Sequence, residues 1–277
     1  MAQLVDFSQI FIGSYMTASK FTSVDMDVIR PAVLNVLRLY RTKFISEFGE
    51  LILCCDSRKS WRKEMFPNYK ASRKKTRSAA PIDWDNLYEC LNKLKEELSE
   101  WFPYKLIQVE KAEADDIIAV LVGLTNERTL ILSSDKDFVQ LHAFNVRQYS
   151  PMQKKFVEGD AKWSLHEKII KGDVGDGVPN IMSDDNVFVD EGRRQKPITK
   201  KKVDAWYEID PDMYCSSEML RNYNRNKQLV DLGEVPESIC INITKQFETT
   251  VVGDRKRLLT YFINHRLKNL TESLSEF

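Results

Sequence analysis

The sequence predicts an α/β fold in which helices flank a mostly parallel central sheet. Short apolar runs typical of buried strands alternate with longer segments whose apolar residues recur at helical spacing. The strand-like runs are Gln3–Phe7, Leu51–Cys55, Tyr104–Val109 and Thr129–Leu132, with a hairpin predicted from Val146–Ser150 and Lys155–Val157. Helical spacing extends over Asp25–Phe48, Trp84–Trp101 and Glu113–Leu124.

The chain beyond about residue 160 has a different character. Strand signals end there, and a polar loop is predicted at 183–198. Helical patterns occur at 161–171, 199–208, 213–232, 237–248 and 254–275. No Gly/Pro-rich linker separates the two parts of the sequence. We therefore predict an α/β core over residues 1–160 and a helical region over residues 161–277 that packs with the core as one unit.

The composition excludes several classes of protein. Of the 277 residues, 43% are hydrophobic, which suffices for a sizeable core, but no apolar stretch is long enough to cross a bilayer. The first residues, MAQLVDF, carry no basic segment of the kind that begins a signal peptide. The five cysteines form no C-x-x-C pair, so neither a disulfide framework nor a zinc site is expected. These features predict a cytoplasmic protein without membrane attachment.

The net charge is zero, with 41 basic and 41 acidic residues, but the charges are segregated along the chain. Residues 58–77 contain nine Lys/Arg and one acid, and residues 191–202 contain six and one. Residues 110–137 contain seven acids and three bases. This pattern indicates a surface that binds a polyanion beside a pocket that binds cations.

Three of the predicted strands end at an aspartate. Asp6, Asp56 and Asp135 each lie just past the C-terminal end of a strand, the edge at which open α/β sheets bind ligands. Converging carboxylates repel one another unless cations neutralise them, and oxygen-only ligands favour Mg²⁺ or Mn²⁺. Two such ions about 3.5–4 Å apart can activate a water and stabilise the leaving oxygen of a phosphodiester. The candidate metal ligands are Asp6, Asp56, Glu113, Asp115, Asp116, Asp135, Asp137, Asp173 and Asp176.

Each of these acids also has an ordinary structural explanation. Acids in a first helical turn, as at Glu113-Ala114-Asp115-Asp116, suit the helix macrodipole. Asp173 and Asp176 lie beside glycines in K-G-D-V-G-D-G-V-P and can form a turn, and Asp6 can cap the helix that follows it. The metal-site hypothesis depends on the joint pattern, in which three strands bring acids to one edge.

The basic segment at about 58–80 follows Asp56 and is expected to be exposed above the acids. Its cations are interleaved with Trp61, Phe66 and Tyr69, so it can engage phosphates and stack on unpaired bases. A solvated run of charge is the plainer explanation. The same choice applies to Arg193, Arg194, Lys196 and Lys200–Lys202, which can hold duplex phosphates or form a solvated loop.

Other functions fit parts of this pattern. One is a related metal-dependent phosphoryl enzyme, such as a PIN-type ribonuclease or a phosphatase, although a D-x-D phosphatase needs an acid where Ser8 stands. Another is a DNA-binding module without activity, which predicts losses among the carboxylates, and none is missing. A structural protein with solvated charge runs leaves the strand-end acids unexplained.

Eight segments follow one another along nearly the whole chain and carry a resemblance. They are V-D-F-S-Q (5–9), C-C-D (54–56), Y-K-A-S-R (69–73), K-A-E-A-D-D-I-I-A-V-L-V (111–122), L-S-S-D-K-D-F-V-Q-L-H (132–142), S-P-M-Q-K-K-F-V (150–157), K-I-I-K-G-D-V-G-D-G-V (168–178) and L-T-E-S-L-S-E-F (270–277). In this order they resemble the flap endonuclease family of 5′-nucleases and, within it, the phage ribonuclease H members. The E-A-D-D and S-S-D-K-D-F blocks together form a specific signature.

The resemblance implies a PIN-like 5′-nuclease core and a 5′ to 3′ exonuclease and flap endonuclease activity on DNA and RNA–DNA duplexes. It implies removal of RNA primers and flaps in lagging-strand DNA replication, with 5′-phosphate and 3′-hydroxyl products. It also implies a monomer in the cytoplasm of a host cell. Replication proteins such as a single-strand binding protein or a sliding clamp are the implied partners.

The resemblance also assigns roles to residues. It implies that Asp6, Asp56, Asp115 and Asp135 surround one Mg²⁺, with Glu113 and Asp116 close by, and that Asp137, Asp173 and Asp176 serve a second Mg²⁺ mostly through waters. The basic segment becomes an arch, in which Lys70 and Arg73 act with Asp135 in catalysis. The implied nucleic-acid contacts are Arg62, Tyr69, Lys70, Arg73, Lys74, Lys75, Lys200, Lys201 and Lys202.

The sequence departs from the family after the G-D-x-x-D turn. Many relatives continue there with a glycine-rich helical hairpin that grips duplex backbone and a monovalent cation. Here the run is V-P-N-I-M-S-D-D, without those glycines. A potassium site is therefore not predicted, whereas duplex contact by this region still is.

Overall fold

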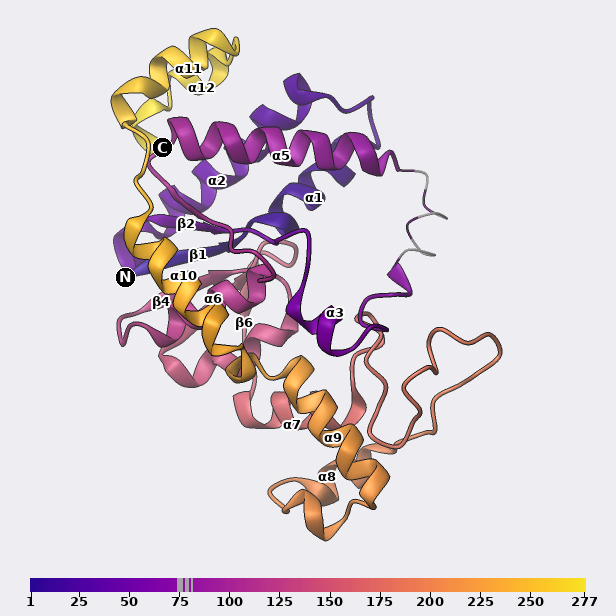
Figure 1. The fold of residues 1–277 in the computed structure, drawn as a ribbon. Helices are drawn as coiled ribbons and strands as arrows, with labels where there is room; N and C mark the ends of the chain where they lie inside the picture. Colours follow the sequence, from indigo (N-terminus) through magenta and orange to yellow (C-terminus); the bar gives the residue numbers. More distant parts are fainter. Residues whose placement is uncertain (74–76, 78–79, 81) are drawn as a thin grey trace.

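A six-stranded sheet forms the centre of the molecule, which is described by a computed structural model over residues 1–73, 77, 80 and 82–277 (Figure 1). The strand order is β3-β2-β1-β4-β5-β6. Neighbouring strands are parallel except for β5 and β6, which are antiparallel. The strands are β1 (Ala2–Asp6), β2 (Leu51–Cys54), β3 (Lys105–Ile107), β4 (Thr129–Leu132), β5 (Val146–Ser150) and β6 (Lys155–Val157).

Helices cover both faces of this sheet (Figure 1). In chain order they are α1 (Phe7–Ala18), α2 (Met26–Phe48), α3 (Trp61–Met65), α5 (Trp84–Trp101), α6 (Ala114–Gly123), α7 (Ala161–Lys171), α8 (Lys200–Trp206), α9 (Ser217–Val230), α10 (Glu237–Thr249), α11 (Leu258–Asn264) and α12 (Lys268–Thr271). Single 3₁₀ turns join several of them, and a longer one spans Lys136–Phe144. None of the described helices is both long and apolar enough to span a membrane.

Alternate strand residues face two hydrophobic cores, one on each side of the sheet. Val5, Leu53 and Leu132 belong to the core shared with α1, α2, α5 and the C-terminus. Leu4 and Ile131 belong to the core shared with α6 and α10. Because successive side chains of a strand point to opposite faces, fully apolar strands are what a sheet buried on both faces requires.

The strand register brings the predicted acids to one edge. Asp6, the last residue of β1, is in register with Cys54 of β2, and Val5 is in register with Leu132 of β4. The chain therefore leaves β1, β2 and β4 at the same level, and Asp56 and Asp135 follow directly. The order of strands reverses between β1 and β4, which is the position at which open α/β sheets bind ligands.

The mostly parallel α/β core with a helical C-terminal region confirms the fold class predicted from the sequence. Five predicted elements coincide with observed ones: Trp84–Trp101, Thr129–Leu132, the two strands of the hairpin, and residues 161–171. The helical pattern predicted over 254–275 is observed as two short helices, α11 and α12, with 3₁₀ turns beside them. Arg266 has φ +56°, a left-handed conformation that interrupts the helix between α11 and α12.

The basic segment is less exposed than the sequence suggested. Trp61, Phe66 and Tyr69 are buried, and Arg62 is only 2% exposed. Phe66 and Tyr69 share a small hydrophobic cluster with Ile169 of α7 and with the end of α9. The segment is thus anchored to the helical region by the same aromatic residues that were expected to face solvent.

The C-terminal residue is a structural part of the core. Phe277 is fully buried, with its ring centroid 5.2 Å from that of Phe262 and 5.9 Å from that of Phe102. We expect Phe277→Ala to lower the free energy of unfolding by about 3 kcal/mol, because it leaves a cavity where a buried ring stood. Urea denaturation measures the change. Phe21→Ala is the control, since Phe21 is 84% exposed, and an equal loss in both variants would contradict this role for Phe277.

Candidate active site

Four aspartates gather at the C-terminal edge of the sheet and the adjoining start of α6. We call Asp6, Asp56, Asp115 and Asp135 the strand-edge quartet. Their charges act on one another: Asp56 and Asp135 help to raise the pKa of Asp6, and all three of these residues help to raise the pKa of Asp115. No Lys or Arg side chain lies within ion-pair distance of the quartet in the part of the chain that the structure describes.

Asp6 is held in place by both of its oxygens. The Gln9 backbone N–H donates to Oδ1 (3.1 Å), which caps α1, and the Ser133 hydroxyl donates to Oδ2 (3.1 Å). Burial, reinforced by the charges of Asp56 and Asp135, raises the pKa of Asp6 to about 7. Asp6 is thus a helix cap, as the structural explanation proposed, and also a carboxylate whose ionised form calls for a cation nearby.

Backbone contacts position the rest of the quartet. Asp56 Oδ1 accepts from the Ala114 N–H (2.9 Å), which ties the loop after β2 to the first turn of α6. Asp135 Oδ1 accepts from the Asp137 N–H (3.0 Å). The buried Gln148 amide donates to the carbonyls of Ser133 and Asp135 and so fixes the chain as it leaves β4.

A second set of acids lies beside the quartet, and we call Asp137, Asp173 and Asp176 the loop group. Lys168, in the last turn of α7, forms ion pairs with both Asp137 and Asp173, the latter at 2.6 Å. Burial raises the pKa of Asp137 to about 6, against the opposing charge of Lys168. Burial also opposes ionisation of Asp173, but Lys168 and nearby backbone N–H groups outweigh it and lower the pKa of Asp173.

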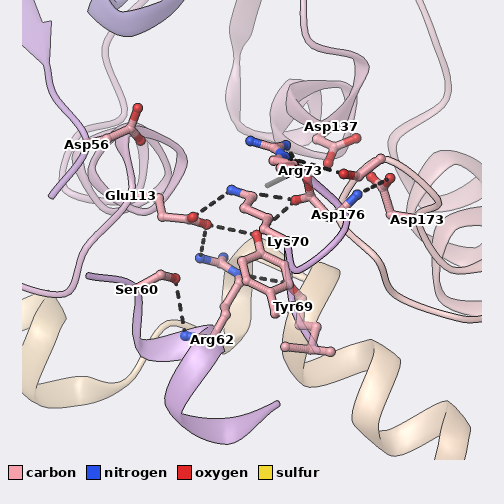
Figure 2. A network of polar contacts seen from close by, with 12 residues as sticks. Asp56, Ser60, Arg62, Tyr69, Lys70, Arg73, Glu113, Asp137, Asp173 and Asp176 are labelled. Carbon is pink, nitrogen blue, oxygen red and sulfur yellow. Dashed lines mark hydrogen bonds and ion pairs between the residues drawn. The ribbon is translucent and has the colours of Figure 1, made fainter. Parts of the chain in front are cut away.

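The remaining acids are engaged by the basic segment (Figure 2). Lys70 Nζ lies 2.6 Å from Glu113 Oε1 and 3.7 Å from Asp176 Oδ2, and Arg73 forms an ion pair with Asp176. The Tyr69 hydroxyl lies 2.9 Å from both Glu113 Oε2 and Asp176 Oδ2. A hydroxyl has one proton, so it donates to only one of these carboxylates at a time.

Asp116 is enclosed more completely than the other acids. It is fully buried, and its Oδ2 accepts from the Glu113 N–H (2.8 Å) and from Trp61 Nε1 (3.1 Å). Arg62 Nη2 lies 2.8 Å from its Oδ1, and Arg62 Nε donates to the Leu229 carbonyl (2.7 Å). This arrangement favours a positioning role for Asp116 and Arg62 over direct contact with metal or nucleic acid.

The predicted nucleic-acid contacts are placed in three ways. Lys70 and Arg73 face the acids, whereas the rings of Trp61, Phe66 and Tyr69 are buried, which contradicts the expectation that they stack on bases. Lys200, Lys201 and Lys202 are exposed at the start of α8, and the structure does not bring them to the acids. Lys74 and Lys75 lie outside the described residues.

Several positioning residues were missed by the sequence analysis. Asn226 of α9 donates to the carbonyls of Ile169 and Pro179, both at 2.8 Å, and Asn222 donates to those of Ile181 (3.0 Å) and Ser183 (3.2 Å). Both asparagines are buried. Asn226 joins the chain on the two sides of the loop that carries Asp173 and Asp176, and Asn222 holds the segment that follows the loop. In the sequence, the available signal was a pair of asparagines four positions apart within a predicted helix. Lys168 belongs to the segment K-I-I-K-G-D-V-G-D-G-V, but the segment alone does not indicate the partners of its side chain.

The donor set fits a hard divalent ion, because all of the converging atoms are carboxylate oxygens. Burial and mutual repulsion raise the pKa values of Asp6 and Asp115, and a bound cation would relieve that repulsion. Among the described residues, however, no three acid, histidine or cysteine side chains converge closely enough to form a ready-made ligand set. A small pocket lies beside the loop group, with Asp115 of the quartet in its wall. Its polar lining consists of Arg62, Tyr69, Asp115, Asp137, Lys168, Asp173 and Asp176.

A broader groove runs from Asp56 along the basic segment to α5. Arg77 lies over the ring of Trp84 (5.2 Å) and that of Tyr88 (5.6 Å), so the α5 wall carries aromatic as well as charged groups. The cations that line the groove are Arg58, Lys59, Lys63, Lys70, Arg73, Arg77 and Lys95. The groove therefore joins a surface rich in cations to the acidic edge of the sheet.

Comparisons with known proteins agree with this architecture. A family profile described as "5′-3′ exonuclease, N-terminal resolvase-like domain" matches residues 2–169, and one described as "T4 RNase H, C terminal" matches residues 159–277. Ribonuclease H of Enterobacteria phage T4 is 33% identical over 99% of this chain and 95% of its own length. A flap endonuclease Xni of a Shewanella species is 31% identical over 44% of this chain and 48% of its own length.

The same fold occurs in solved structures. The bacteriophage T5 D15 flap endonuclease, in a complex described as containing DNA and metal ions, has a TM-score of 0.67 at 17% identity and covers 89% of this chain and 98% of its own. A T5 D15 structure co-crystallised with metal ions has a TM-score of 0.63 at 19% identity, with the same coverage. With its strand-edge aspartates and its matches over nearly the full length, this chain belongs to the 5′–3′ exonuclease family.

Proposed function

We propose that this chain is a metal-dependent 5′ to 3′ exonuclease and flap endonuclease that hydrolyses phosphodiester bonds near the 5′ ends of DNA and RNA–DNA duplexes. The observation that carries the proposal is the strand-edge quartet, whose members lack cation partners among the described residues, beside a groove lined by cations. Converging like charges repel one another unless cations neutralise them, so this cluster, of which Asp6 is buried, fits a site that binds positive charge.

The quartet and the loop group are the residues that would hold Mg²⁺, or Mn²⁺ in its place. Bound there, two such ions would supply an activated water and charge stabilisation for the leaving oxygen. The chain itself supplies orientation: Ser133 and the Gln9 N–H fix Asp6, and the Ala114 N–H fixes Asp56. Lys70 and Arg73, which pair with Glu113 and Asp176, are the cations that we propose act on the scissile phosphate.

Several finer points of the proposal rest on the relatives. The T4 relative is named a ribonuclease H and the Shewanella relative a flap endonuclease, so RNA primers and 5′ flaps are the substrates we propose. A role in lagging-strand replication follows, with 5′-phosphate products and action as a monomer in the host cytoplasm. We also propose that a single-strand binding protein or a sliding clamp is a partner.

The first prediction concerns the metal. Asp135→Asn should lower kcat on a 5′-labelled flap by at least about 100-fold, because it removes the charge of a proposed metal ligand. The thermal melting curve should stay close to that of the parent, because Asp135 is exposed. The parent should be inactive in excess EDTA and recover with Mg²⁺ or Mn²⁺. Glu248→Gln, at an exposed acid on α10, is the control. Unchanged turnover in EDTA would falsify the proposal.

The second prediction separates the cations of the basic segment. Lys70→Ala and Arg73→Ala should each lower kcat by at least about 100-fold and change the Kd for flap DNA by less than about threefold, since cations at the scissile phosphate act on developing charge. Lys63→Ala is the matched control, because Lys63 is exposed and lines the same groove. Single-turnover cleavage and anisotropy measure the two quantities.

By contrast, Lys200→Ala should weaken duplex binding modestly and reduce its salt dependence, with little change in kcat, as expected for a phosphate contact far from the reaction. If Lys70→Ala and Lys200→Ala both lose only affinity, the assignment of Lys70 to the scissile phosphate is wrong.

A further inference from the structure

The two groups of carboxylates differ in how their charge is balanced. Within the described residues, the strand-edge quartet has no ion pair, whereas every member of the loop group has one. Asp176 pairs with Lys70 and Arg73, and Asp137 and Asp173 share Lys168. The chain therefore neutralises one group internally and leaves the other to an external cation.

Lys168 is bound into this position by the backbone around it. The Gly172 N–H donates to the Lys168 carbonyl (2.8 Å), and Gly172 has φ +66°. A Cβ at Gly172 would lie 2.3 Å from the Val178 carbonyl oxygen, so only glycine fits where α7 ends. The turn that follows brings Asp173 back toward the last turn of α7. The ammonium of Lys168 is consequently kept beside Asp173 by the course of the chain.

The surroundings of Lys168 leave its ammonium few alternatives. Its side chain is 19% exposed, and those of Asp137 and Asp173 are 21% and 23% exposed. All three line the small pocket together with Asp115 of the quartet and Asp176. An ammonium between two half-buried carboxylates occupies the kind of position that a divalent cation takes between carboxylate ligands.

We propose that Lys168 is an internal counter-cation that competes with the second metal ion for Asp137 and Asp173. The proposal rests on the nuclease function proposed above, since it assigns those two acids to that ion. A divalent ion binds the loop group only by displacing the ammonium, so this ion binds more weakly than the one at the quartet. Lys168 is in this account a positioning residue that sets the order in which the two ions bind.

Isothermal titration with Mn²⁺, without nucleic acid, tests the proposal directly. The parent should bind one ion tightly and a second one weakly. Lys168→Met keeps the length of the side chain and removes its charge, so the second Kd should tighten by at least about tenfold while the first stays within about threefold. Lys168→Arg retains the charge and should leave the second site weak.

Lys171→Met is the matched control. Lys171 lies on the same helix, its side chain is 40% exposed, and within the described residues it pairs only with Glu167. This variant should give the same Mn²⁺ titration as the parent. Circular dichroism melts verify that each variant is folded, and Lys168→Arg remains informative if Lys168→Met does not fold. The proposal is overturned if second-site binding in Lys168→Met is unchanged or weaker, or if Lys168→Arg tightens it equally. Because the titration counts bound ions and no bond is cleaved, its outcome is independent of whether the parent cleaves flap DNA.

Discussion

Repulsion among carboxylates at one edge of the sheet is the constraint on which the rest of this structure depends. The parallel register of β1, β2 and β4 delivers Asp6, Asp56 and Asp135 to the same level, and α6 begins at that level with Asp115. Burial, together with the charges of the neighbouring acids, raises the pKa values of Asp6 and Asp115. The cations of the neighbouring segments are arranged around this cluster. In the proposed function, the negative charge that they leave unpaired binds divalent metal ions.

The helical region takes part in this arrangement through polar contacts that are themselves buried. Arg62 links Glu113 and Asp116 to the carbonyl of Leu229 at the end of α9, and Asn226 holds the carbonyls of Ile169 and Pro179. A buried carbonyl without a partner is costly, so these contacts stabilise the packing of α9 against the segments on both sides of the loop group. The core and the helical region are thus distinguished by their sequence patterns, but residues of both regions position the acids.

The sequence was sufficient to predict the fold class, the strand-end acids and the basic segment, because apolar periodicity and the residues that follow a strand can be identified from short stretches of sequence. It was not sufficient for the partners of buried polar groups, which depend on contacts between distant segments. Arg62 and Tyr69 were expected at the nucleic acid, yet Arg62 forms an ion pair with Asp116 and the Tyr69 hydroxyl lies within hydrogen-bond distance of Glu113. Lys168 was missed for the same reason, since its partner Asp137 lies 31 positions earlier in the chain.

The most direct test of this account measures whether neutralising the acids admits a phosphate backbone. Labelled flap DNA is titrated by anisotropy in EDTA, in Ca²⁺, and in NaCl of matched ionic strength, with the parent and with Asp135→Asn. Ca²⁺ neutralises carboxylates but is a poor substitute for Mg²⁺ in activating water. The account predicts that Ca²⁺ tightens the Kd of the parent by at least about tenfold over matched NaCl, with a smaller gain for Asp135→Asn. Equal affinity of the parent in Ca²⁺ and in matched NaCl would contradict it.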